Sequence, residues 1–119
     1  MVRRTGPSNY ELQQLISQLQ PKARQSSFWK RVLEDVQKPT RDRREVNVYK
    51  IAEYALDGET VLVPGKVLSV GEINKKVTVA AMNFSLEAKR KISGAKGKAL
   101  SIQELLQQNP EGKNVRIIG

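Results

Sequence analysis

The sequence contains no cysteine and no histidine. These two absences exclude a disulfide, a zinc site built from cysteine and histidine, a thiol nucleophile and an imidazole base. Aspartate, glutamate, lysine and tyrosine can still serve an enzyme, so these absences argue against catalysis without excluding it. Since no other catalytic pattern is found, we expect no catalytic residue, no metal and no cofactor, and we interpret the chain as a protein that is not an enzyme. A chain without cysteine also suits a reducing compartment.

Long apolar runs are missing as well. None approaches the roughly 20 residues that cross a membrane, and the start, Met1 to Pro7, lacks the apolar stretch of a signal peptide. We therefore expect a cytoplasmic protein with no membrane partner. With 119 residues, of which 39% are hydrophobic and 5% aromatic, the chain should form one domain with a modest core.

Acidic residues are outnumbered. Lysine and arginine number 21 against 12 aspartates and glutamates, which gives a net charge of +9, and the sequence pI is about 10.0. Such a balance is typical of nucleic-acid binders, because each neutralised phosphate releases a condensed counterion. A membrane surface, an acidic protein partner, or a solvated basic face that serves solubility are the alternatives.

Two helices are predicted near the start of the chain. Ser8 and Glu11 form a capping box that opens the first, and Pro21 is expected to end it. The second begins near Ser26 or Ser27 and stops before Pro39. We expect the two to form a hairpin that buries their apolar stripes: Leu12, Leu15, Ile16 and Leu19 on the first helix, and Trp29, Val32, Leu33 and Val36 on the second, with Phe28 and Trp29 serving as core.

A third helix is predicted after residue 46. Asn47 is expected to cap it with its side chain, and Gly58 to end it in a left-handed conformation. After Gly58 the pattern becomes extended, with strands over 60–63 and 67–70 that a turn at Pro64-Gly65 separates.

Further short elements follow. Residues 77–81 form the strongest strand, apolar nearly throughout and therefore buried on both faces. Ser85 should cap a short helix that reaches about Ile92, and residues 93–98 are predicted to be a loop. A second capping box, Ser101 with Glu104, opens another helix, and a turn over 109–112 precedes a terminal strand over 115–118.

These elements predict an α/β fold. A helical N-terminal segment, residues 1–57, precedes an irregular mixed α/β core of short strands and helices, residues 58–119, and the two parts form a single domain.

No motif indicates catalysis. Gly65-Lys66 is not a phosphate loop, because no glycine stands five residues before Gly65 and Val67 replaces the required serine or threonine. We interpret Lys66 as the exposed tip of a turn. Glu34 and Asp35 are the nearest approach to a catalytic pair, and they lie among basic residues on a helix face. We therefore expect no small-molecule substrate.

Arginines in the segment 40–45 are the strongest binding candidates. Arg41, Arg43 and Arg44 can contact phosphate oxygens with two donors each and can stack on bases. Asp42 and Glu45 lie between and beside them, so local salt bridges are the alternative. Further candidates are Arg3 and Arg4 on a basic N-terminal arm, and Lys22 and Arg24 in the linker between the first two helices.

Two lysine pairs in the second part are also candidates. Lys96 and Lys98 lie in the glycine-containing loop, whose backbone can approach a phosphate closely, although an ordinary solvated loop is the alternative. Lys75 and Lys76 precede the buried strand, where they either touch RNA backbone or protect a sheet edge. No motif that reads bases is present, so recognition of shape and phosphate is expected.

Several segments resemble one known family. Ser27–Val32 (SFWKRV), Lys38–Arg41 (KPTR) and Glu45–Val48 (EVNV) are similar to the N-terminal part of the archaeal and eukaryotic large-subunit ribosomal protein L eighteen-e family. The later segments that agree with this family are VPGKVL at 63–68, VTVAA at 77–81, Phe84-Ser85, NPEG at 109–112 and Val115-Arg116. The resemblance covers nearly the whole chain in order, and the short length is typical of the archaeal members.

The resemblance implies a fold related to bacterial ribosomal protein L fifteen. It also implies a structural constituent of the large ribosomal subunit, with large-subunit ribosomal RNA and neighbouring large-subunit ribosomal proteins as partners. A free-standing RNA-binding protein or RNA chaperone is the alternative. The resemblance implies candidate RNA contacts at the basic positions in or near its matching segments: Lys30, Arg31, Lys38, Arg41, Arg43, Arg44 and Lys66.

Overall fold

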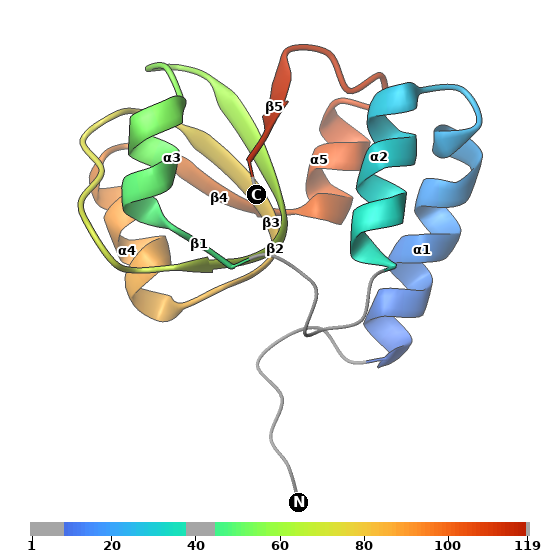
Figure 1. Ribbon diagram of the computed structural model, residues 1–119, viewed down its shortest axis with the longest axis horizontal. Helices are drawn as coiled ribbons and strands as arrows, with labels where there is room; N and C mark the ends of the chain where they lie inside the picture. Colours follow the sequence, from blue (N-terminus) through green and yellow to red (C-terminus); the bar gives the residue numbers. More distant parts are fainter. Residues whose placement is uncertain (1–8, 38–44, 119) are drawn as a thin grey trace, which may run out of the picture.

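A five-stranded sheet lies between two groups of helices in the computed structural model, which describes residues 9–37 and 45–118 (Figure 1). The helices are α1 (Asn9–Ala23), α2 (Ser27–Val36), α3 (Val48–Tyr54), α4 (Leu86–Gly94) and α5 (Ile102–Gln108). The strands are β1 (Glu45–Asn47), β2 (Thr60–Leu68), β3 (Thr78–Phe84), β4 (Lys98–Ser101) and β5 (Val115–Ile117). The predicted α/β class is confirmed.

All strand pairs in the sheet are parallel. The order is β1-β2-β3-β4, and β5 also pairs with β2. Strand β5 lies beside residues 60–62 and β1 beside residues 66–68, so these two short strands share the edge of β2 that β3 leaves open. The segment 1–57, which was predicted to be helical, therefore also contributes the strand β1. This strand has only three residues, too few to show a sequence pattern.

Side chains alternate between the two faces of the sheet. Val61 and Val79 point into a core under α3 and α4, whereas Leu62 and Ala80 point into a second core under α1, α2 and α5. This is the reason for the nearly continuous apolar run over 77–81, and its predicted burial on both faces is confirmed.

The predicted break at Pro64-Gly65 is wrong. Both residues are buried within β2, where they lie opposite the single residue Met82 of β3. The register shift between Val63 and Lys66 marks a β-bulge. A bulge leaves its extra residue out of the ladder, so a proline without an N–H is tolerated in a central strand.

The predicted hairpin of α1 and α2 is confirmed, with Leu19 and Trp29 fully buried. Pro21 does not end α1, which continues to Ala23. It lies in the last turn at an exposed position, where a missing N–H costs one hydrogen bond, and the helix retains its packing on α2. Ser26 caps α2 by accepting from the backbone N–H of Trp29. Ser8 lies outside the described residues.

Helix α3 follows the sequence only in part. Asn47 occupies the capping position, but its Oδ1 accepts from the backbone N–H of Val70, at 3.2 Å, instead of from the helix. Gly58 is left-handed, with φ of +85°, yet α3 has already ended at Ala55 in an extended conformation. Gly58 therefore shapes the turn into β2.

The other elements agree more closely. Ser85 caps α4, and the capping box of Ser101 and Glu104 opens α5. The turn over 109–112 and the terminal strand are present. The predicted loop over 93–98 is shorter than expected, because α4 extends to Gly94 and β4 begins at Lys98. No helix within the described ranges is long and apolar enough to cross a membrane.

Candidate nucleic-acid interface

The predicted binding residues fall into separate regions of the fold. Arg3, Arg4, Lys38, Arg41, Arg43 and Arg44 lie outside the described residues. The arginine-rich segment joins Gln37, the C-cap of α2, to Glu45, the first residue of β1. The remaining candidates are Lys22, Arg24, Lys30 and Arg31 on the hairpin, Lys66 in β2, Lys75 and Lys76 before β3, and Lys96 and Lys98 around the turn that follows α4.

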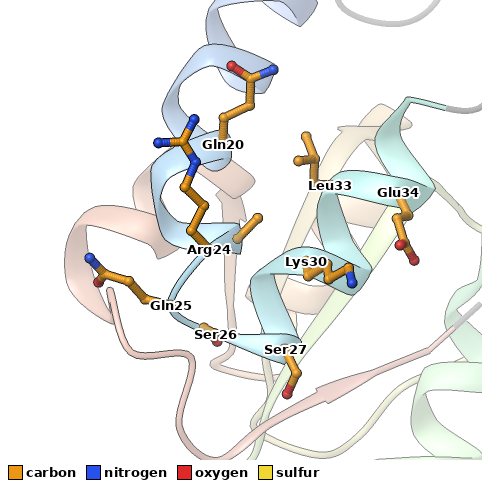
Figure 2. A pocket seen from close by; sticks show the side chains of 9 residues that line it. Gln20, Arg24, Gln25, Ser26, Ser27, Lys30, Leu33 and Glu34 are labelled. Atoms are coloured by element: carbon orange, nitrogen blue, oxygen red, sulfur yellow. The ribbon is translucent and has the colours of Figure 1, made fainter.

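An open groove of about 750 Å³ lies at the turn of the hairpin (Figure 2). Arg24 lines it from the turn after α1, with its side chain running back along α1 toward Gln20, and Lys30 lines it from α2. Among the described residues, Glu34 is the one acid that lines it. The other lining residues are Gln20, Ala23, Gln25, Ser26, Ser27 and Leu33. We call this region the hairpin groove; it presents two cations among amide and hydroxyl side chains, which are suited to phosphate oxygens.

The two other hairpin cations are less available. Arg31 forms an ion pair with Asp35, Nε to Oδ2 at 3.6 Å, although its side chain is 64% exposed. Lys22 is partly buried, and its carbonyl oxygen accepts from the backbone N–H groups of Gln25 and Ser26 at 3.0 Å. The backbone of Lys22 therefore helps to shape the turn beside the groove.

Lys66 is not at the tip of a turn, contrary to the prediction. It lies within β2, half-buried, beside Glu45 on one neighbouring strand and Asn83 on the other. The bulge explains the difference, because Pro64-Gly65 continues the strand instead of reversing it.

Lys75 uses its charge within the protein. Its Nζ donates to the carbonyl oxygens of Ala52 at 2.6 Å and Ala55 at 2.9 Å. A lysine in this position satisfies free carbonyls at the end of a helix and complements the helix dipole. Lys75 therefore stabilises the end of α3, and its contact with RNA stays a prediction.

Lys76, Lys96 and Lys98 are brought together by the tertiary structure. The backbone N–H of Lys98 donates to the carbonyl of Val77 at 3.1 Å, and Gly97 lies against the same backbone. All three lysines are exposed, and no ion pair joins them to an acid among residues 9–37 and 45–118. We call them the lysine cluster. Asp57 contacts the backbone of this cluster: its Oδ1 accepts from the N–H of Lys76 at 2.7 Å.

Another hollow lies beside β5, lined by residues 58–60 and 114–116. Its distinctive electrostatic feature is the ion pair of Glu59 and Arg116. Arg116 donates Nε to Oε1 at 3.0 Å and Nη2 to Oε2 at 3.1 Å. These hydrogen bonds, with one from the backbone of Leu56, hold the pKa of Glu59 below its ordinary value, and Glu59 raises the pKa of Arg116. A carboxylate held in its ionised form suits a structural ion pair and not proton transfer.

The comparisons with known proteins agree with one another. The protein-family model described as "Ribosomal protein 60S L18 and 50S L18e" matches residues 5–119. The chain belongs to this family. The match spans the hairpin groove, the lysine cluster and the arginine-rich segment, and it confirms the resemblance noted in the sequence.

Individual relatives of the L18e family align over almost their full length. Those described next carry the name large ribosomal subunit protein eL18. That of Methanopyrus kandleri is 47% identical over 121 residues, which cover 96% of this chain and 95% of the relative. Those of Methanospirillum hungatei and Sulfurisphaera tokodaii are 44% and 42% identical, covering 99% of this chain and 99% and 98% of the relatives.

This L18e-family chain also carries cations on α4 that the sequence interpretation missed. Lys91 Nζ donates to the carbonyls of Ser69 at 2.7 Å and Gly71 at 2.6 Å, and so holds the loop after β2. Arg90 pairs with Glu87 at 2.8 Å, and Lys89 is exposed. The run of three basic residues at 89–91 could have revealed these cations from the sequence. The apolar positions 88 and 92 leave 89 and 90 on the solvent side of the helix.

Proposed function

We propose that this chain is a structural constituent of the large ribosomal subunit in the cytoplasm, without catalytic activity, that binds and stabilises large-subunit ribosomal RNA. Membership of the L18e family and relatives named as large-subunit proteins support the ribosomal role. The sequence expectation of neighbouring ribosomal proteins as further partners belongs to the same proposal.

The hairpin groove carries the RNA-binding part of the proposal. Arg24 and Lys30 come from different segments of the hairpin, and neither has an ion-pair partner within the described residues. Two unpaired cations beside amide and hydroxyl side chains suit a phosphate backbone. The basic segments act by neutralising phosphates and by presenting a surface of complementary shape.

The first test is gradient sedimentation of a cell lysate at rising salt, probed for this protein. An integral subunit protein migrates with the large subunit, and it remains there at moderate salt. Migration in the light fractions at all salts would contradict the ribosomal role and would favour a free-standing RNA-binding protein or chaperone.

The groove itself is tested with Arg24→Gln/Lys30→Gln in equilibrium binding to large-subunit rRNA. Each lost phosphate contact lowers the slope of log affinity against log salt by about 0.7–0.9. The control, Arg90→Gln/Lys113→Gln, removes the same charge from residues that are exposed and already paired with Glu87 and Glu111. If both double variants had the same slope of log affinity against log salt, the groove would not be part of the RNA interface.

A further inference from the structure

The end of α4 is closed by a Schellman motif with a lysine at its critical position. The backbone N–H of Gly97 donates to the carbonyl of Ile92, and that of Lys96 donates to the carbonyl of Ser93, both at 2.9 Å. These are the two bonds that define the motif. They place Lys96 at the residue after the C-cap, where it adopts a left-handed conformation with φ of +67°.

Glycine is the usual residue at this position, because it has no Cβ to oppose a left-handed backbone. Among the described residues that are not glycine, only Lys96 and Asn114 have a positive φ. Asparagine is enriched in this conformation because its short polar side chain can hydrogen-bond to the local backbone, which the lysine side chain does not do. Lys96 therefore occupies a strained position for which a better residue exists, and strain of this kind often accompanies a functional constraint.

The surroundings hold Lys96 in place and leave its side chain free. Gly97 lies so close to the backbone of Val77 that a Cβ there would collide with the Val77 carbonyl oxygen. The turn is thereby fixed against the start of β3, and Lys98 enters β4 immediately after it. Lys96 itself is exposed, and no ion pair or side-chain hydrogen bond is formed by it within residues 9–37 and 45–118.

We propose that Lys96, with Lys98 and Lys76 beside it, is a pre-ordered binding site for the phosphate backbone of RNA. This inference rests on the proposed function and names a site within it. The residues around Lys96 are small, Gly94, Ala95 and Gly97, and the position of a Cβ at Gly94 meets open space. A nucleic-acid backbone can approach such a turn closely.

A purely structural reason for the lysine exists and makes a different prediction. A cation near the end of a helix complements the helix dipole. If Lys96 served only α4, loss of its charge would lower stability and leave RNA binding unchanged. If Lys96 serves RNA, loss of its charge lowers affinity, whereas replacement by glycine raises stability because it relieves the left-handed strain.

The experiment compares Lys96→Gly, Lys96→Gln and Lys96→Arg in the full chain. Binding to large-subunit rRNA is measured from ~50 to ~200 mM salt, and thermal unfolding is followed for each protein. Raising the salt over this range lowers the affinity of wild type by a certain factor. In Lys96→Gly and Lys96→Gln we expect that factor to be about threefold smaller, because one phosphate contact is lost. Lys96→Arg retains the wild-type slope, and Lys96→Gly unfolds at a higher temperature than wild type.

Asn114→Gly provides the matched control, because it relieves a left-handed residue without removing a charge. It should bind rRNA as wild type does. If wild type binds with a steep salt slope and Lys96→Gln has the same slope, the Lys96 site is overturned and the proposed function survives. If wild type itself does not bind rRNA, the proposed function fails. A Lys96→Gln protein that binds naked rRNA normally but is lost from large subunits would assign the lysine cluster to a protein neighbour and overturn the RNA site.

Discussion

Trp29 joins the helical hairpin to the C-terminal end of the chain. Its ring is fully buried and lies edge-on to Phe28, with ring centroids 4.8 Å apart. Its Nε1 donates to the carbonyl of Pro110 at 2.9 Å, and the ring of Phe28 packs so closely on Gly112 that a Cβ there would collide with it. One aromatic pair thus packs the start of α2 against the turn over 109–112.

We expect Trp29→Ala to lower the free energy of unfolding by about 3–5 kcal/mol, because it leaves a large cavity in the core under the hairpin. Urea denaturation followed by circular dichroism measures this loss. Tyr10→Ala is the control: Tyr10 is 71% exposed, and its loss should change stability by no more than about 0.5 kcal/mol. A loss for Trp29→Ala as small as that of the control would mean that the hairpin is not held by this residue.

The ion pair of Glu59 and Arg116 predicts a pH dependence with a definite sign. Hydrogen bonds from Arg116 and from the backbone of Leu56 lower the pKa of Glu59 in the folded chain. The ion pair therefore stabilises the fold above the ordinary pKa of glutamate, about 4.3, and this contribution is lost as the pH falls through the lowered pKa. Between neutral pH and about pH 3, the urea midpoint of wild type should fall more than that of Glu59→Gln. Parallel curves would contradict this.

At the scale of elements, two glycines at the end of α4 and before β4 differ in the space around them. Gly94 is the last residue of α4, and a Cβ there meets open space. Gly97 packs so closely on the backbone of Val77 that a Cβ has no room. The first glycine is conformationally replaceable, and the second is not.

Gly94→Ala should stabilise the chain by about 0.4–1 kcal/mol, because alanine loses less backbone entropy on folding. Gly97→Ala should destabilise it by more than this, because β4 must move away from β3 to admit the methyl group. Denaturant unfolding of the two variants gives the comparison. Destabilisation by both would show that α4 ends in a conformation that alanine does not tolerate.

At the scale of the whole molecule, the two cationic regions lie in different parts of the fold: α1 and α2 cover one face of the sheet, and α4, whose end adjoins the lysine cluster, covers the other (Figure 1). The hairpin groove belongs to α1 and α2, whereas the lysine cluster follows α4. Two separate cationic regions suit a protein that contacts separate segments of a large RNA and holds them together.

If six to ten phosphates are contacted in all, affinity for rRNA should fall by about 10³–10⁵ between ~50 and ~200 mM salt. Because the groove and the lysine cluster share no partner within the described residues, combining Arg24→Gln/Lys30→Gln with Lys96→Gln should reduce the slope additively. Filter binding across the salt range measures both quantities. A shallow slope in wild type would contradict binding through phosphate neutralisation.

Local signals were sufficient for much of the fold. Ser26, Ser85 and Ser101 cap helices because a hydroxyl can accept from the N–H three residues ahead, and this depends on neighbouring residues alone. The apolar run over 77–81 predicted a strand buried on both faces for a similar reason. Where local preferences and packing agreed, the prediction held.

The charge of +9 and the family segments likewise followed from the sequence by itself, because charge is additive and does not depend on the fold. Only the tertiary structure decided which cations remain available. Lys75 and Lys91 are indistinguishable by type from Lys96, yet they donate to carbonyls of distant segments. Pro64 continues a strand because β2 pairs with β3 on both sides of the bulge, and Asn47 accepts from Val70 because the fold brings the two together. Such contacts depend on three-dimensional neighbours, which no local pattern specifies.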